Sequence, residues 1–352
     1  MTPLAQMLVQ RIRAGGPITL AEYMGECLLH PTHGYYATRD PFGQAGDFTT
    51  APEISQMFGE MIGLWLAQVW LDQGATAPFA LVELGPGRGT LMADILRATR
   101  GVAGFHDALS VHLVEASPTL RAVQTKTIAR PVTHHDTCAS LPDLPLFLVA
   151  NEFFDALPIR QFSRNGGHWS EQMVGLDAGK LSLGRGAPSP QPALGHHTDT
   201  NDGDIVELCP ALPGILQDLA TPIARNGGAA LVIDYGDWRS RGDTVQALRA
   251  HQSEDILASP GEADLTAHVD FEAIARAATP LRASPMTPQG VFLERLGITA
   301  RAQALAAALE GEALRSHIAA HRRLTHPEEM GNLFKTIALL PEGAPVPPGF
   351  AQ

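Results

Sequence analysis

A cluster of glycines in the first third of the chain has the composition of a ligand-binding turn. The stretch GPGRG at residues 85–89 follows a run, 79–84, that is apolar except for Glu83. It precedes residues 90–98, whose apolar side chains recur at helical spacing. Glycine lets the backbone turn sharply and lets a ligand come close to the main-chain amides. The pattern therefore predicts a strand, a binding turn and a helix in succession. The glycines expected to contact the ligand are Gly85, Gly87 and Gly89.

The spacing of these glycines distinguishes between classes of ligand. A phosphate-binding loop would continue into Gly-Lys-Ser/Thr, which this sequence lacks. The dinucleotide fingerprint would have glycine where Thr90 stands. The observed G-x-G-x-G, with Glu83 two residues before it, recurs in methyltransferases that use S-adenosylmethionine (SAM). A tight turn that binds nothing is the alternative interpretation.

Acidic residues follow the next two predicted strands. The run 109–115 ends in Glu115, and Asp136 comes directly after the short strand 131–135. In an open parallel sheet, ligands bind outside the carboxyl ends of the strands. Glu115 is therefore expected to accept the ribose hydroxyls of an adenosine, and Asp136 to meet the adenine amino group. For Asp136, an ordinary surface aspartate is an equally good interpretation.

The fourth predicted strand, 146–150, runs directly into a polar cluster. Asn151, Glu152 and Asp155 follow the apolar stretch LFLVA. Two acids and an amide after a buried strand are costly unless they bind something or stay hydrated. The cluster is therefore interpreted as functional, with Asn151 on the cofactor side. Helix capping by Asn151 or Asp155 is the alternative.

The order of the predicted elements indicates how these residues are positioned. Apolar strands alternate with helices from residue 79 to about 150, and another buried strand follows at 228–236. This rhythm predicts an α/β fold with a mostly parallel sheet covered by helices on both faces. The expected divisions are an N-terminal helical and lid region (1–75), the first part of the core (76–158), a β-rich antiparallel insertion (159–210), the rest of the core with C-terminal helices (211–340), and a flexible tail (341–352).

The segment before the first core strand predicts a capped helix and a loop. Thr50 and Glu53 fit a capping box. An apolar stripe follows at Met57, Met61, Leu64, Trp65 and Val69. The residues just before the cap, which include a glycine, an acid and an aromatic ring, are interpreted as a lid over the cofactor or as an ordinary connection. They are Gly46, Asp47, Phe48 and Thr49.

Composition excludes several classes of protein. The 352 residues carry a net charge of −12 and no basic patch, which argues against a nucleic-acid partner. The apolar runs are too short to span a bilayer, and the N-terminus lacks a secretory core. The three separated cysteines show no metal spacing. We therefore expect a cytoplasmic protein without a metal, and no oligomeric state is indicated.

The chain resembles the MidA-type family of SAM-dependent methyltransferases, which includes a mitochondrial arginine methyltransferase needed for assembly of respiratory complex I. The resemblance implies a Rossmann-like class I methyltransferase fold, SAM bound by the glycine turn and Glu115, and symmetric dimethylation of an arginine in a complex I subunit. The segments that carry it are GPITLAEYM, HPTHGYY, GDFTTAPEISQMFGE, ELGPGRGTLMADILR, LVEASPTLRAVQ, NEFFDALPIRQF, IDYG, PGEADLTAHVDF and MGNLFKTIALL.

An arginine substrate would give the acids after the fourth strand a specific task. Guanidinium is protonated and delocalised at neutral pH. Paired carboxylates can hold it and concentrate its positive charge on the nitrogens that do not attack. Glu152 is the first choice for this role and Asp155 the second. The rival functions are a small-molecule SAM methyltransferase, a dehydrogenase, and an assembly factor that binds SAM without catalysis.

Overall fold

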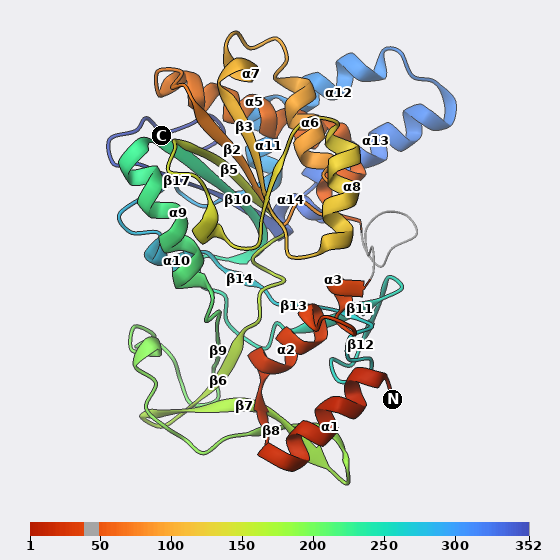
Figure 1. Cartoon of the computed structure of the whole chain (residues 1–352), viewed down its shortest axis with the longest axis vertical. Coiled ribbons are helices and arrows are strands. Elements are labelled where there is room, and N and C mark those ends of the chain that lie inside the picture. Colours follow the sequence, from red (N-terminus) through yellow and green to blue (C-terminus); the bar gives the residue numbers. More distant parts are fainter. Residues whose placement is uncertain (39–48, 352) are drawn as a thin grey trace.

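The computed structural model describes residues 1–38 and 49–351, and its centre is a mixed sheet (Figure 1). The strand order is β15-β17-β10-β5-β2-β3-β4. Five of these strands run parallel: β2 (Phe79–Leu84), β3 (Leu109–Val114), β4 (Thr133–His135), β5 (Leu146–Asn151) and β10 (Gly228–Asp237). The alternation of strands and helices thus gave the expected sheet: helices connect β2 to β3 and β3 to β4, as neighbouring parallel strands require a crossover connection.

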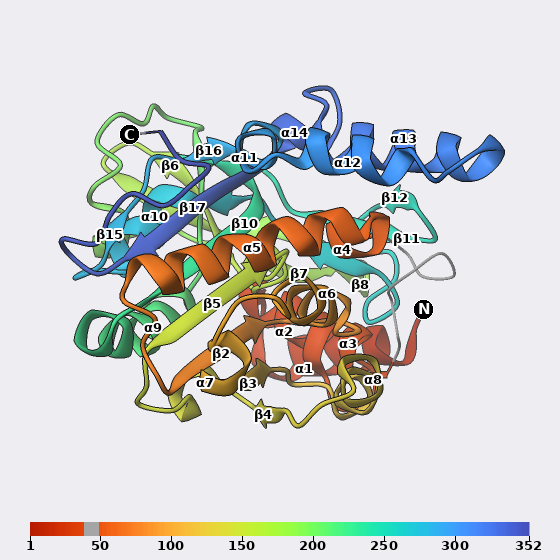
Figure 2. The same cartoon turned by 90° about the horizontal axis from the view of Figure 1, so that it is seen from above.

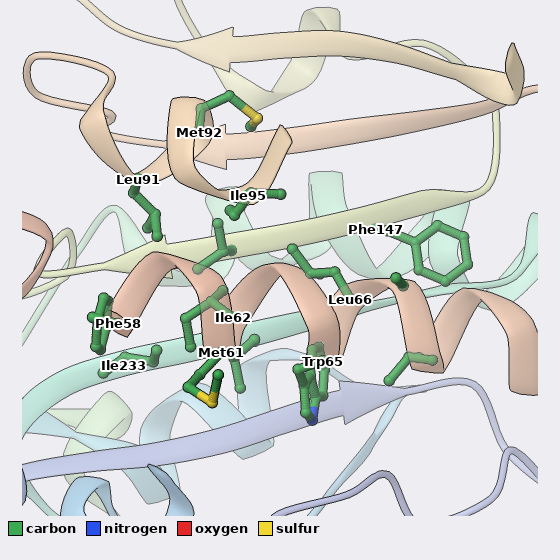
Figure 3. Close-up of a cluster of buried hydrophobic side chains, with 14 of the residues drawn as sticks. Phe58, Met61, Ile62, Trp65, Leu66, Leu91, Met92, Ile95, Phe147 and Ile233 are labelled. Carbon is green, nitrogen blue, oxygen red and sulfur yellow. The ribbon is translucent and has the colours of Figure 1, made fainter. Parts of the chain in front are cut away.

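Helices cover both faces of this sheet. On one face lie α5 (Gln56–Asp72) and α6 (Thr90–Ala98), and on the other α9 (Leu212–Asn226) and α10 (Phe271–Ala277). Figure 3 shows the first face, where α5 and α6 pack on β5 and β10. Successive residues of β5 face opposite sides of the sheet. Phe147 packs in the hydrophobic cluster that includes α5, and Leu148 packs in the cluster that includes α9. The strands are therefore apolar on both sides, as a buried parallel sheet requires.

The antiparallel insertion forms a separate sheet, seen in the lower half of Figure 1. Its strands are β6 (Arg160–Asn165), β7 (His168–Asp177), β8 (Lys180–Arg185) and β9 (Ile205–Leu208). The N-terminal helices α1 (Pro3–Gly15) and α2 (Leu20–Leu29) lie against this sheet, and β1 (Ile18–Thr19) between them pairs with β7. The first 29 residues thus pack with the insertion, whereas α5 packs on the central sheet.

Several elements from the second half of the chain complete the structure. A small antiparallel sheet contains β11 (Gln246–Arg249), β12 (Gln252–Glu254) and β13 (Asp264–Thr266). Helices α12 (Ile298–Ala306) and α13 (Gly311–Thr325) extend away from the body (Figure 2).

The other elements are α3 (Tyr35–Thr38), α4 (Ala51–Ile54), α7 (Phe105–Ala108), α8 (Pro118–Ile128), η1 (Cys138–Ser140), η2 (Pro192–Leu194), β14 (Val269–Asp270), β15 (Arg282–Ala283), β16 (Thr287–Pro288), α11 (Gln289–Leu296), α14 (Met330–Leu333) and β17 (Phe334–Leu340).

Two expectations for the C-terminal part are wrong. Residues 334–340 are not helical but form β17, which pairs antiparallel with β10. This segment is apolar on both faces and therefore suits a sheet interior. The last residues are not a free tail either. Phe350 is buried against Trp65 and Phe292, and the Trp65 Nε1–H donates to the Pro348 carbonyl across 3.0 Å.

The expected capping box is also wrong. Thr50 makes no side-chain bond to the helix, and α4 ends where Ser55 becomes extended. Ser55 instead caps α5, accepting from the Met57 amide. Glu53 accepts a hydrogen bond from the Thr90 hydroxyl, so this acid joins α4 to α6. In α5, Leu64 lies outside the apolar stripe because 47% of it is exposed.

Helices long and apolar enough to cross a membrane are absent from the described residues.

Candidate functional site

A cavity of about 1190 Å³ lies at the carboxyl ends of the parallel strands. Its walls come from the glycine turn after β2, the starts of the segments after β3, β4 and β5, and the end of β10. Segments around α2 to α4 and the small β11–β13 sheet complete it. Ligand pockets commonly measure about 300–1,000 Å³. This cavity therefore has room for a cofactor and part of a second molecule.

The glycine turn has the left-handed backbone that only glycine adopts easily. The φ angles are +61° at Gly85, +51° at Gly87 and +82° at Gly89. Gly85 and Gly87 line the cavity, as expected. Gly89 does not line it. A Cβ there would lie 3.2 Å from Ile128 and 3.3 Å from the Gln124 Cα, so this glycine lets α6 pack closely on α8. This glycine is therefore needed for packing, and its expected contact with the ligand stays a prediction.

Glu115 is buried at the end of β3 and is fixed by two donors. The Ser117 amide donates to its Oε1 across 2.8 Å, and the Gln124 side chain donates to its Oε2 across 3.0 Å. Gln124 also donates to the Gly87 carbonyl across 2.8 Å. Burial raises the pKa of Glu115, and these hydrogen bonds oppose the rise. One buried amide side chain thus joins the proposed ribose acid to the glycine turn.

Asp136 lines the same part of the cavity but is open to solvent, with 87% of its side chain exposed. It forms an ion pair with Arg121, which also donates to the Glu115 carbonyl. The proposed contact between Asp136 and an adenine stays a prediction.

Glu83 lines the cavity beneath the turn and is almost fully buried. Burial raises its pKa to about 8, and the nearby carboxyl of Glu115 adds to the rise. Its Oε2 has no hydrogen-bond partner. At neutral pH this acid is therefore largely protonated, and the proton makes it a potential donor to a ligand.

Glu152, the first residue after β5, has a left-handed backbone with φ of +51°. Such a conformation is uncommon outside glycine and often marks functional sites. Its Oε1 accepts from the Ala51 amide and from the Asn151 side chain, each across 3.0 Å. Burial raises the pKa of Glu152 to about 7, and Asp155 contributes to this rise. The acid is thus positioned rigidly in the cavity wall.

Asp155 lies in the same wall and is 6% exposed. Its backbone is held by Asp234, whose Oδ2 accepts from the amides of Phe154 at 3.0 Å and Asp155 at 3.3 Å. Burial raises the pKa of Asp155 to about 6, while the neighbouring Tyr235 hydroxyl acts in the opposite direction. Capping of a helix does not explain these acids, because no helix begins at residues 151–158.

The cavity contains buried oxygens that lack a donor. They are Glu83 Oε2, Asn151 Oδ1 and Asp155 Oδ1. Buried polar atoms are normally hydrogen-bonded, so unpaired ones indicate a missing partner. SAM carries an ammonium group, ribose hydroxyls and an adenine amino group as donors, together with a cationic sulfonium. The residues present therefore fit this cofactor.

Part of the expected lid lies outside the described residues, namely Gly46, Asp47 and Phe48. Thr49 is half-buried, and the next residue, Thr50, lines the cavity. The lid over SAM stays a prediction.

Four further residues at the site were not assigned a role from the sequence. Gln124 lies within the helix α8 and Tyr36 within the four-residue helix α3, so no local pattern singles them out. Asp234 lies near the end of β10, and its bonds to the 152–155 turn depend on the sheet register. Asp264 lies on β13, in a small sheet that periodicity did not predict.

A parallel sheet with a glycine turn after β2 and an acid after β3 defines a Rossmann-like, SAM-dependent methyltransferase. The family model described as "Putative S-adenosyl-L-methionine-dependent methyltransferase" matches residues 61–288. The chain belongs to this MidA-type family of SAM-dependent methyltransferases, and SAM is its cofactor.

Known relatives resemble the chain over nearly its whole length. The mitochondrial protein arginine methyltransferase NDUFAF7 of Mus musculus is 38% identical, covering 97% of this chain and 85% of its own. The Danio rerio protein of the same name is 39% identical, covering 95% and 86%. A COG1565 superfamily member from Burkholderia thailandensis, solved with S-adenosyl-homocysteine, has a TM-score of 0.81 at 30% identity and covers 98% of this chain and 93% of its own.

Proposed function

We propose that the chain methylates arginine side chains of a protein. The observation that carries this proposal is the charge of the cavity. Eight of its described lining residues are aspartate or glutamate, and one is arginine. Those that are buried or half-buried, such as Asp155 and Glu152, are costly to ionise together unless a cation joins them. The cofactor and an arginine side chain would both supply positive charge to this cavity. The relatives named as protein arginine methyltransferases support the same substrate.

The residues after β5 would hold the guanidinium. SAM, when bound, supplies a methyl group on a cationic sulfur. Glu152 has its Oε1 fixed by Ala51 and Asn151, so its carboxyl cannot rotate freely. Together with Asp155 it would orient the guanidinium and draw positive charge toward the nitrogens that do not attack. As the attacking nitrogen loses its proton, a carboxylate with a raised pKa is a suitable acceptor. Such alignment contributes several kcal/mol, on the order of 7–11 at best.

The cofactor would be held on the other side of the cavity. Gly85 and Gly87 line the cavity without side chains, so a ligand can come close to the main chain there, and Glu115 would accept the ribose hydroxyls. Glu83, Asn151 and Asp136 complete the set of candidate contacts. The family resemblance further supports symmetric dimethylation of a complex I subunit as the specific reaction. A cytoplasmic location is part of the same proposal.

A labelling experiment tests the proposed function. The purified protein is mixed with isotopically methyl-labelled SAM and lysate from cells that lack the protein, so that its natural targets are unmethylated. Mass spectrometry then identifies the labelled species. Label on a protein arginine, lost with the Glu152→Gln variant, is the expected result. Label confined to small molecules would overturn the arginine assignment, and SAM binding without any transfer would favour an assembly factor.

A further inference from the structure

Polar side chains from outside the cofactor-binding strands line the same cavity. Tyr36 comes from α3, Tyr235 from the end of β10, and Asp264 from β13. Asp264 is buried, with 5% of its surface exposed. None of these residues is needed to recognise the adenosine, whose candidate contacts lie at β2 to β4. They are therefore candidates for the part of the cavity that receives the substrate.

Asp155 is fixed next to this group by main-chain bonds. The Ala267 amide, just after β13, donates to the Asp155 carbonyl across 2.9 Å. The Asp155 amide is held in turn by Asp234. The main chain of Asp155 is therefore held in the cavity wall from both sides. Its Oδ1 is buried and has no donor, although the rest of the residue is well anchored.

Tyr36 lines the same cavity as both carboxyls. Its hydroxyl donates to Oδ1 of Asp264 across 2.8 Å. Burial raises the pKa of this hydroxyl, and the carboxyls of Asp264 and Asp155 add to the rise. A tyrosine hydroxyl has one proton to donate. Because that proton is committed to Asp264, Tyr36 does not satisfy Asp155.

We infer that Asp264 is a substrate-positioning residue that acts through Tyr36: by accepting the Tyr36 proton it keeps Asp155 Oδ1 open to an N–H of the substrate guanidinium. The inference rests on the proposed arginine substrate. A guanidinium has five N–H donors, so it can serve Glu152 and Asp155 together. Without Asp264, the Tyr36 hydroxyl would donate instead to Asp155 and compete with the substrate for the same oxygen.

This arrangement makes a prediction that a structural role alone would not make. Asp264→Ala should weaken substrate binding, and adding Tyr36→Phe should restore it, because the competing hydroxyl is then gone. Tyr36→Phe alone is the background in which the effect of the Asp264 change is compared. A charge-assisted hydrogen bond of about 1.5–3 kcal/mol corresponds to roughly a ten- to hundredfold loss for the single Asp264 variant.

The test titrates acetyl-arginine amide into protein loaded with S-adenosyl-homocysteine and follows binding by NMR for the parent, both single variants and the double variant. Cofactor affinity, measured by calorimetry, should be the same in all four. For the protein substrate identified by the labelling experiment, KM should rise in the Asp264→Ala variant and recover in the double variant, while kcat changes less than about twofold. If Asp264→Ala does not fold, Asp264→Asn replaces it in the same cycle, with a smaller expected loss.

Three results would overturn the inference: parental binding by the Asp264 variant, a double variant that binds no better than that single variant, or a parent that does not bind the arginine probe. If the proposed function itself is wrong, the labelling experiment will show methyl label on a species without arginine.

Discussion

The backbone amide of Ala51 donates a hydrogen bond of 3.0 Å to Oε1 of Glu152, a residue 101 positions further along the chain. Ala51 is the first residue of α4, and Glu152 directly follows the central strand β5. The position of this acid is therefore set jointly by the sheet and by the N-terminal segment that precedes α5. Movement of that segment would be transmitted directly to the acid proposed to hold the substrate.

Glu152→Gln should abolish most methyl transfer while keeping SAM affinity. Glutamine retains an oxygen that can accept from Ala51, but it carries no negative charge for a guanidinium. If that interaction acts mainly in the transition state, kcat falls while binding changes little. Calorimetry with SAM and a methylation assay on the labelled client measure the two quantities. Transfer at the parental rate would show that Glu152 does not hold the substrate.

The glycine turn and the acid after β3 were predictable because each depends on local sequence. A turn with left-handed residues at 85 and 87 needs glycine, and the strand before it is apolar except for Glu83. The sheet was predictable for a related reason, since buried parallel strands and amphipathic helices differ in periodicity. Local sequence can therefore predict which residues lie at the edge of the sheet, but it does not predict which other residues they contact.

The remaining part of the site depends on contacts between distant segments. Gln124 joins Glu115 to Gly87 only because α8 packs beside the turn. The bond from Tyr36 to Asp264 spans 228 residues. Similarly, the capping box at Thr50 failed because Glu53 found a partner on α6. A tertiary contact can replace a local one at similar free energy, and one sequence does not reveal which forms.

The pH dependence of catalysis should report the acids after β5. Burial gives Glu152 a pKa of about 7 and Asp155 a pKa of about 6, and a protonated carboxyl cannot hold a guanidinium. With SAM saturating, kcat/KM for the client should therefore fall as the pH drops through 7 and 6. The profile of kcat should be flatter, because the bound cation favours the carboxylates. A kcat/KM that stays constant between pH 5.5 and 8 would contradict these roles.

Gly87→Val should prevent SAM binding. Gly87 lines the cavity with φ of +51°, a conformation that a β-branched residue adopts only with strain. The matched control is Gly101→Val, because a side chain at Gly101 meets nothing within 4 Å. Both variants should give folded protein by circular dichroism, and only the control should bind SAM in calorimetry. Parental affinity in the Gly87 variant would place the cofactor elsewhere.

Glu115→Ala should weaken SAM roughly ten- to hundredfold, the equivalent of a charge-assisted interaction of about 1.5–3 kcal/mol. The same change removes the acceptor for Gln124, so the turn at Gly87 loses part of its support. Gln124→Ala separates the two effects, because it frees the turn but keeps the acid. We expect a smaller loss of affinity for Gln124→Ala. An affinity change below twofold for Glu115→Ala would remove this residue from the cofactor site.

Glu152, which is proposed to hold the substrate, should also reduce the stability of the ligand-free protein at neutral and alkaline pH. Burial raises the pKa of Glu152 from 4.5 to about 7, so the folded state holds the proton more tightly than the unfolded state. The resulting stabilisation is present in full below pH 4.5 and is lost as the pH rises through 7. At about 1.4 kcal/mol per pKa unit, the loss reaches up to about 3 kcal/mol.

Glu152→Gln removes this titration, so the variant should be more stable than the parent at pH 8, by up to about 3 kcal/mol, and nearly equal to it at pH 4.5. Urea unfolding without SAM at both pH values measures the difference. Glu328→Gln makes the same chemical change at a side chain that is 82% exposed, and it should leave the free energy of unfolding nearly unchanged. A gap between parent and Glu152→Gln that is the same at both pH values would mean that this carboxyl titrates normally in the folded protein. Saturating SAM and client should narrow the gap at pH 8, because a bound guanidinium compensates the buried charge that glutamine lacks.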